Sequence, residues 1–393
     1  MLTMRQKQAL TSAIKKRYQK AGKLEKGTIL DEFVASCGYN RSYARRILGG
    51  LYTPKKDKRT KHKIVRKRIY DGEVFYPLKT LWVAADGICG KRLKPFIPEL
   101  LRVLKREKEI KVKKNIEKKL VTVSAATIDR MLVGLRKQYK LKGISTTKPG
   151  TLLRQSIPIR TFADWDETSP GFFEADLVAL CGETVKGDYV NCLDMTDVAT
   201  GWVGLEAFMG KAQVRVHRAV DTIRERLPIP MKGIDSDNGS EFINYLLKSY
   251  CEAHAITFTR IRPYRKNDNC YVEQKNYTVV RRFLGYARYD RQYQLVLIKQ
   301  ILKLVELYVN FFQPVMKLKT KVRVGTRTKK TYNTAKTPYQ KLLELRVLDT
   351  TQKNKLTKLY ESLNPIKMKR EITKLTIKLE KTLRYKLDEA TKG

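Results

Sequence analysis

Three carboxylate residues have the spacing and setting of a metal-dependent phosphoryl-transfer site. Asp176 lies in an apolar run, Asp237 directly follows another, and Glu273 lies early in a helical stretch. Sixty residues (177–236) separate the first two acids and thirty-five (238–272) the last two. Mg²⁺ prefers oxygen ligands, and two such ions about 3.5–4 Å apart stabilise the attacking and leaving oxygens of a displacement at phosphorus. We therefore expect these acids to be catalytic residues and metal ligands, with Mg²⁺, or alternatively Mn²⁺, as the cofactor.

The pattern of apolar residues predicts the elements that position these acids. Strands are expected at residues 171–180, 188–194, 202–208, 232–236 and 256–261, and helices at 211–227, 239–253 and 268–286. Three strands come first, and helices then alternate with the last two strands. Asp176 falls inside the first strand, Asp237 just after the fourth, and Glu273 in the third helix.

Other acids compete for the same roles. Glu174 and Asp235 each lie two residues before a chosen acid, which puts them on the same strand face by the two-residue period. Asp194 and Asp197 lie near the second strand. Glu241 is expected to cap the first turn of the helix that follows Asp237, because negative charge suits the positive end of a helix dipole.

Two sequence blocks carry a family resemblance. Residues 237–242 read Asp-Asn-Gly-Ser-Glu-Phe, and residues 269–276 read Asn-Cys-Tyr-Val-Glu-Gln-Lys-Asn. With the order of elements, they resemble the catalytic core of retroviral-type integrases and the related bacterial DDE transposases, over residues 172–289. The resemblance implies an α/β ribonuclease-H-like core, a five-stranded mixed sheet with flanking helices. It also selects Asp176, Asp237 and Glu273 over their acidic neighbours.

The helix that carries Glu273 departs from the family in its cations. The family often places a lysine four or seven residues after its Glu, where this sequence has Tyr277 and Val280. Other polar residues of this helix are then expected to contact DNA, namely Lys275, Asn276, Arg281 and Arg282.

The charge distribution indicates a polyanionic partner. The formal net charge is +43 and the pI is near 10. Lys and Arg that displace counterions from phosphates give non-specific affinity for nucleic acid. Between residues 171 and 245, however, twelve acids outnumber seven bases. The excess positive charge therefore lies in the flanking regions, including the basic residues of 317–336, for which an extended or strand-like DNA-contact segment is expected.

The N-terminal region has the pattern of a helix-turn-helix. Helix-like stretches at 28–34 and 41–49 flank Gly38, which suits a tight turn, and Asn40, which suits a helix cap. The second helix would then direct Arg41, Arg45 and Arg46 toward DNA. An ordinary helical hairpin with basic faces is the alternative.

The chain is expected to divide into six segments. These are a helix-turn-helix domain (1–52), a basic arm and helical region (53–118), a second helix-turn-helix-like segment (119–143), a linker (144–165), the ribonuclease-H-like core (166–290), and a basic C-terminal region with terminal helices (291–393). The leucine stripes of the last segment are expected to pack within the chain, with self-association as the alternative. Six Cys without a paired CxxC and three His do not predict a zinc module, which favours the bacterial insertion-sequence branch.

These patterns together predict a DNA transposase or integrase that cleaves element ends and transfers strands. Its partners would be double-stranded DNA, both element ends and target, and further copies of the same chain on that DNA, with no membrane. Without a signal peptide pattern, a cytoplasmic protein, nucleoid-associated when bound to DNA, is expected. The alternatives are a ribonuclease-H-like nuclease without strand transfer and a catalytically idle DNA-binding protein derived from a transposase.

Overall fold

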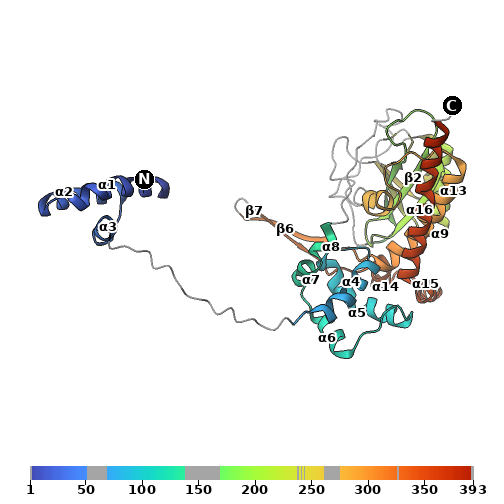
Figure 1. Ribbon diagram of the computed structural model, residues 1–393. Coiled ribbons are helices and arrows are strands. Elements are labelled where there is room, and N and C mark those ends of the chain that lie inside the picture. Colours follow the sequence, from blue (N-terminus) through green and yellow to red (C-terminus); the bar gives the residue numbers. More distant parts are fainter. Residues whose placement is uncertain are drawn as a thin grey trace. The chain divides into compact units, whose positions relative to one another are not determined.

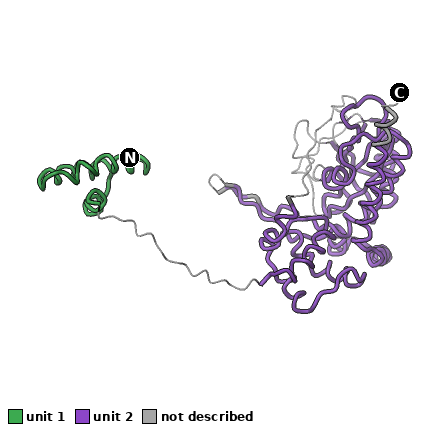
Figure 2. Tube along the Cα trace, viewed as in Figure 1, with its two compact units in different colours: residues 1–68 green, residues 69–393 purple. Residues whose placement is uncertain are grey.

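A computed structural model describes residues 2–50, 69–137, 169–236, 239, 241–242, 244–260, 275–324 and 327–390. The chain divides into two compact units, residues 1–68 and 69–393 (Figure 2). Each unit has its own hydrophobic core, so each is described by itself.

The first unit consists of three helices, α1 (Met4–Lys20), α2 (Lys23–Cys37) and α3 (Arg41–Leu48). Its core includes Phe33 and Leu48, which are both fully buried. Gly38 ends α2 with a φ of 65°, a left-handed conformation that glycine adopts without steric cost. Asn40 caps α3, and its side chain accepts a hydrogen bond from the Ser42 backbone N–H at 2.9 Å. The predicted turn and cap are confirmed, although α2 begins five residues before the expected start at Thr28.

The second unit is built on a five-stranded mixed sheet. Its strands are β1 (Phe172–Ala179), β2 (Val190–Asp197), β3 (Val203–Met209), β4 (Gly233–Ser236) and β5 (Thr257–Arg260). The strand order is β3-β2-β1-β4-β5; β1 runs antiparallel to β2 and parallel to β4. Helices α9 (Gln213–Arg226) and α10 (Tyr245–Ala253) connect the last three strands. The architecture confirms the predicted ribonuclease-H-like fold.

Helices cover both faces of this sheet (Figure 1). On one face α9 packs against β3 so closely that a Cβ at Gly204 would lie 2.4 Å from the Ile223 side chain. Only glycine allows this approach. On the other face lies a π-helix, η2 (Asn276–Arg281), which continues into α12 (Arg282–Leu284). This second face carries the polar side chains described below.

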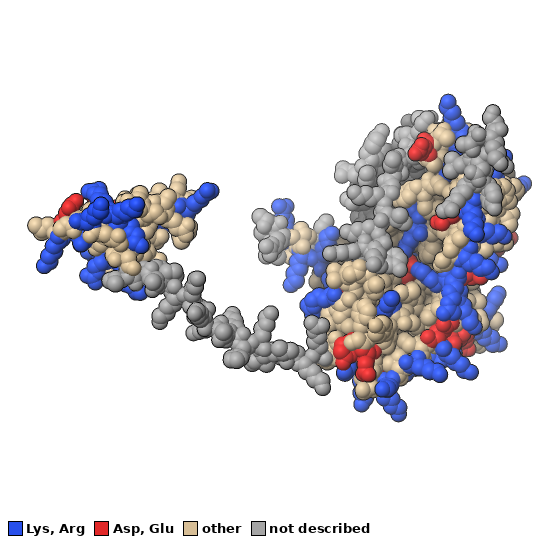
Figure 3. All heavy atoms as spheres, viewed as in Figure 1, with Lys and Arg blue, Asp and Glu red and all other residues tan. Residues whose placement is uncertain are grey.

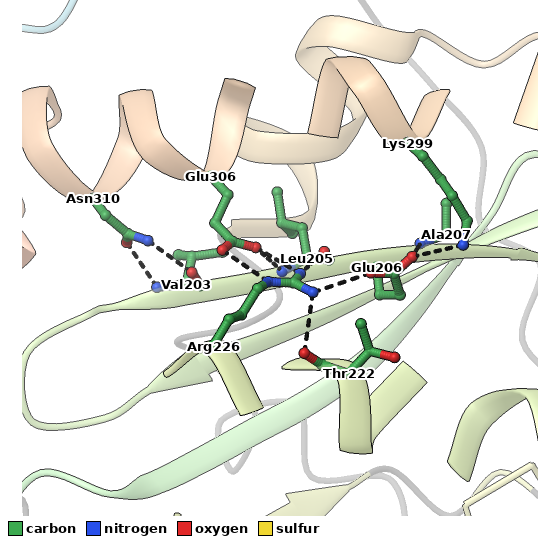
Figure 4. A network of polar contacts seen from close by, with 9 residues as sticks. All are labelled: Val203, Leu205, Glu206, Ala207, Thr222, Arg226, Lys299, Glu306 and Asn310. Carbon is green, nitrogen blue, oxygen red and sulfur yellow. Dashed lines mark hydrogen bonds and ion pairs between the residues drawn. The ribbon is translucent and has the colours of Figure 1, made fainter. Parts of the chain in front are cut away.

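A long helix packs along β3, the strand at one edge of the sheet. This helix is α13 (Gln292–Phe312). Its Asn310 accepts from the Val203 N–H and donates to the Val203 carbonyl, both at 2.8 Å, and Glu306 accepts from the Leu205 N–H at 2.7 Å (Figure 4). Arg226 of α9 binds the Glu306 carboxylate at 2.9 Å. Side chains of α13 thus occupy the hydrogen-bonding groups that an edge strand otherwise offers to another strand.

The flanking regions contribute helices to the same unit. They are α4 (Gly72–Ala84), α5 (Gly90–Arg106), α6 (Lys114–Thr122), α7 (Ala125–Met131), α8 (Val133–Lys137), α14 (Pro338–Leu345), α15 (Thr350–Ser362) and α16 (Pro365–Ala390). Buried residues of α4, α5, α13 and α16 belong to one hydrophobic cluster with those of the sheet. The segments expected at 119–143, 166–290 and 291–393 therefore lie in one compact unit, as does 69–118. The expected linker, 144–165, lies outside the described residues.

In the C-terminal region, the predicted strand-like segment and the predicted packing of the leucine stripe within the chain are confirmed. Strands β6 (Leu318–Val324) and β7 (Arg327–Tyr332) form an antiparallel hairpin in the basic segment. Ile372 and Leu379 of the leucine stripe on α16 are buried, and α16 packs against α13. Within the described residues, no helix has the length and apolar character that would let it cross a membrane.

Several local predictions need correction. Helix α10 begins at Tyr245, not at residue 239, and its cap is Asn244, which accepts from the Leu247 N–H at 2.9 Å. Glu241 instead faces Lys211 at 3.7 Å, because the helix starts too late for its carboxylate to reach the first turn. In the segment expected to resemble a helix-turn-helix (119–143), residues 125–137 form two short helices, α7 and α8, and Ser124 caps α7.

Candidate active site

Asp176 lies in β1 with both carboxylate oxygens engaged. The Asn276 side-chain amide donates to its Oδ2 at 2.6 Å, and the Leu177 backbone N–H donates to its Oδ1 at 2.8 Å. Asn276 is the first residue of η2, a hundred residues later in the chain. The element that follows Glu273 in sequence is therefore held against the strand that carries Asp176.

Four carboxylates share this face of the sheet. Asp176 is the register partner of Asp194 on β2, and Glu174 is the partner of Asp235 on β4. Residues two apart on a strand, and residues paired across strands, point to the same face. Glu174, Asp194 and Asp235 are each at most 1% exposed, whereas Asp176 is partly exposed. Asp176 is thus the one of these four that a ligand can reach most directly.

Hydroxyl groups hold two of the buried acids. Thr196 donates to Asp194 Oδ1 at 3.0 Å, and Thr259 donates to Asp235 Oδ1 at 2.5 Å. These bonds tie β2 and β5 side chains into the same polar layer. The buried acids are therefore part of the sheet's interior packing.

A buried lysine offsets part of this negative charge. Lys275 precedes η2 and is only 9% exposed. Burial lowers the pKa of Lys275, and the attraction of Asp194 opposes that change. Burial likewise raises the pKa of Asp194, against the attraction of Lys275. Each group thus stabilises the charged form of the other in an environment that disfavours both charges.

The four residues near Glu273 that were predicted to contact DNA interact with other parts of the chain. Lys275 is buried, and Asn276 binds Asp176. Arg281 donates to the Ala179 carbonyl at 2.8 Å, and Arg282 binds the carboxylate of Asp86 at 2.7 Å. All four side chains therefore have partners within the chain. Arg281 is half-buried and Arg282 remains exposed, so a DNA contact by these two arginines stays a prediction.

Asp237 and Glu273 lie outside the described residues, so the predicted triad is described only at Asp176. In the parts that are described, no group of three or more His, Cys, Asp or Glu is arranged to hold a metal ion. The side chains around Asp176 nonetheless suit a hard cation, because they supply carboxylate, amide and hydroxyl oxygens. Within the same described parts, two buried oxygens of this cluster, Asn276 Oδ1 and Asp194 Oδ2, have no hydrogen-bond partner. Such oxygens commonly bind ordered water or an ion.

The DNA-contact residues predicted in the first unit lie on the surface of α3. Arg41, Arg45 and Arg46 are exposed, as is Tyr43. Arg41 forms an ion pair with Asp31 of α2. Ala44 and Leu48, on the opposite side of the helix, are fully buried. Helix α3 therefore presents a basic face away from its own core.

Sequence reasoning missed the polar layer beneath Asp176. It named Glu174, Asp194 and Asp235 only as competitors for metal binding, and it assigned Lys275 to DNA. The two-residue strand period already placed Glu174 beside Asp176. The pairing of Asp176 with Asp194 depends on the β1–β2 register, which the sequence alone does not fix.

A comparison with known proteins identifies a relative but no described family. No protein-family model matches the sequence. The uncharacterized protein y4rM of Sinorhizobium fredii is 38% identical over 337 residues, which cover 84% of this chain and 93% of y4rM. The chain belongs to the same family as y4rM.

More distant similarities involve viral proteins. The Gag-Pol polyprotein of avian reticuloendotheliosis virus is 32% identical over 99 residues, which are 24% of this chain and 8% of the polyprotein. Among solved structures, the catalytic core domain of BIV integrase has 18% identity and a TM-score of 0.31, covering 45% of this chain and 95% of that domain. A chain of the simian T-cell lymphotropic virus intasome, solved with a PP2A regulatory subunit, has 14% identity and a TM-score of 0.30, covering 50% and 64%.

Proposed function

We propose that this protein is a polynucleotidyl transferase of the DDE transposase and integrase type. It would cleave the ends of a DNA element and join them to target DNA. Asp176, Asp237 and Glu273 would be its catalytic acids. The bacterial insertion-sequence branch is the form that we favour, because the sequence has no predicted zinc module.

The observation that carries this proposal is the convergence of three chain segments at Asp176. Ser236, the residue before Asp237, is the register partner of Ala175, the residue before Asp176. Asn276, three residues after Glu273, binds the Asp176 carboxylate at 2.6 Å. Consecutive Cα atoms are about 3.8 Å apart, so these short separations limit how far Asp237 and Glu273 can lie from Asp176. That restriction supports a shared site for the three acids.

The protein's own residues would have distinct tasks in this reaction. Asp176, Asp237 and Glu273 would hold divalent metal, Mg²⁺ or Mn²⁺, and Asn276 would fix the orientation of the Asp176 carboxylate. The bound ions would activate a water or a 3′-hydroxyl and stabilise the leaving oxygen at phosphorus. Asp194 and Asp235, which accept hydrogen bonds from threonine hydroxyls, would keep the strands in register. The metal ligands would then keep their distances from one another.

Separate surfaces would bind the DNA. The basic face of α3 suits sequence recognition in the major groove, since it follows a three-residue turn and carries Arg45 and Arg46. The hairpin β6–β7 carries exposed cations, including Lys319, Arg323 and Lys329, which suit phosphate contact. Joining two ends requires two active sites, so we propose that copies of the chain assemble on DNA.

The proposal is tested with duplexes taken from the DNA that flanks the coding region. In Mg²⁺, the wild-type protein should nick the 3′ end of such a duplex and join it to a second duplex. Asp176→Asn, Asp237→Asn and Glu273→Gln should each abolish the nick, since each removes a ligand charge with little change in shape, while DNA affinity stays within about twofold. Glu252→Gln is the control, because Glu252 lies exposed on α10.

Three results would contradict parts of the proposal. Near-normal cleavage by any one of the three variants would remove that residue from the site. Nicking without joined product would indicate a nuclease. Binding by the wild-type protein with no nick in Mg²⁺ or Mn²⁺ would indicate an idle DNA-binding protein.

A further inference from the structure

Helix α16 is amphipathic, and its two faces differ sharply in charge. Met368, Ile372 and Leu379 are buried in the shared core. Five cations occupy the opposite side: Lys367, Arg370, Lys374, Lys378 and Lys381, all exposed. Figure 3 shows Lys and Arg gathered in a band over this helix. We refer to these five residues as the α16 basic face.

The spacing puts the five cations on a narrow strip. At 3.6 residues per turn they fall within an arc of about 80° around the helix axis. Their Cα atoms span about 21 Å along it, at 1.5 Å per residue. Glu371 lies beside this arc, and Glu380 lies on the far side of the helix. The strip is therefore positive over its whole length.

Intramolecular partners neutralise little of this charge. Arg370 faces Glu109 at 3.3 Å, and Lys374 faces Glu371 at 3.9 Å. Two carboxylates thus oppose five cations. Like charges three or four residues apart destabilise a helix, and the strip contains four such neighbouring pairs. A bound polyanion would remove that repulsion.

The side chains of α16 leave a shallow, open space beside the strip. A shallow groove of about 580 Å³ is lined by residues of α16 that include Arg370, Lys374, Lys378 and Lys381. Exposed Ile377 and Thr373 complete part of its floor. Lys369 also reaches this groove, but it forms an ion pair with the buried Asp86.

We propose that the α16 basic face binds the phosphate backbone of duplex DNA. Phosphates of one strand advance by about 3.4 Å each along the duplex axis, and the five cations span about 21 Å. A strip of this length can therefore contact three or four phosphates in a row. The contacts would carry no sequence information, because they involve only the backbone. They would hold DNA against the same compact unit that contains Asp176. This proposal rests on the DNA partner of the proposed function.

The test compares two variants of the full chain that lose the same charge. The first variant replaces Lys367, Lys374, Lys378 and Lys381 with Gln. The control replaces four other exposed lysines with Gln, namely Lys113, Lys118, Lys353 and Lys358. Affinity for a duplex of scrambled sequence is measured against salt concentration. Each lost phosphate contact lowers the slope of log affinity against log salt by about 0.9.

We expect the first variant to lower the slope by about 2 to 4, and the control to change it by less than 1. Circular dichroism should show an intact helix in both, since the substitutions relieve repulsion. In the wild-type protein, DNA should protect Lys374 and Lys378 from an amine-reactive label and leave Lys353 and Lys358 unprotected.

Several results would overturn this inference. Equal slopes for the two variants would show that net charge alone is responsible. Suppose that the wild-type protein binds and nicks DNA, but the first variant has an unchanged slope and DNA does not protect Lys374. The α16 basic face would then not be a DNA-binding surface, and the proposed function would still stand. No salt-dependent DNA binding by the wild-type protein would refute both. Binding of single-stranded RNA or of anionic vesicles at these lysines, but not of duplex DNA, would assign the face to another partner.

Discussion

The bond between Asn276 and Asp176 gives a quantitative prediction about metal affinity. Asn276→Ala removes the amide that donates to Asp176 Oδ2 at 2.6 Å. A hydrogen bond to a charged group contributes about 1.5–3 kcal/mol. Losing a side chain that orients a metal ligand typically weakens metal binding about 10–100-fold, which is about 1.4–2.7 kcal/mol. The two figures agree, so we expect the Mg²⁺ concentration for half-maximal cleavage to rise about 10–100-fold.

The measurement is a Mg²⁺ titration of DNA-end cleavage. Because the substitution weakens a ligand without removing it, activity at saturating Mg²⁺ should recover to near the wild-type value. Tyr277→Ala is the matched control, since Tyr277 is the next residue of η2 and its side chain is 44% exposed. An unchanged half-maximal concentration in Asn276→Ala would refute the positioning role. Activity that no Mg²⁺ concentration restores would instead show that Asn276 acts beyond the metal ligand.

Two further predictions concern the interior of the core and the first unit. Asp194→Asn removes the buried carboxylate that favours the charged form of Lys275, so it should lower the free energy of unfolding in urea by about 1–3 kcal/mol. Asp194→Leu with Lys275→Met should recover most of that loss, and a single-variant loss below about 1 kcal/mol would show that the pair is not ionised. Arg45→Ala with Arg46→Ala should reduce the preference for element-end DNA over scrambled DNA in competition binding. An unchanged preference would move sequence recognition away from α3.

The sequence predicted the sheet well because each strand is a compact apolar run between turn residues. All five strands lie where the pattern of apolar residues puts them, within a few residues. Such patterns reflect burial, and burial is what the fold depends on. Helix starts were less accurate. The block at 237–242 is rich in Asp, Asn, Gly and Ser, which favour turns and caps over helix interiors, and the cap at Asn244 decides where α10 begins.

The sequence could not predict how the flanking regions associate with the core. Helices α4 and α5 are separated from the sheet by more than sixty residues of chain (107–171), and α16 lies at the other end. The apolar faces of these helices can be read from the sequence. Which element each face packs against, however, depends on the tertiary structure. Tyr308 of α13 illustrates this, because its hydroxyl donates to the carbonyl of Ala84 at 2.6 Å. No local pattern links residues so distant.

The choice among neighbouring acids shows what burial adds to spacing. Glu174, Asp176, Asp194 and Asp235 share one face of the sheet, and spacing alone treats Glu174 as an equal of Asp176. A metal that acts on DNA must lie where a phosphate can reach it. Glu174, Asp194 and Asp235 are at most 1% exposed, whereas Asp176 is partly exposed. Accessibility therefore supports Asp176 as the metal ligand on β1. The three deeper acids belong to the buried polar layer beneath Asp176.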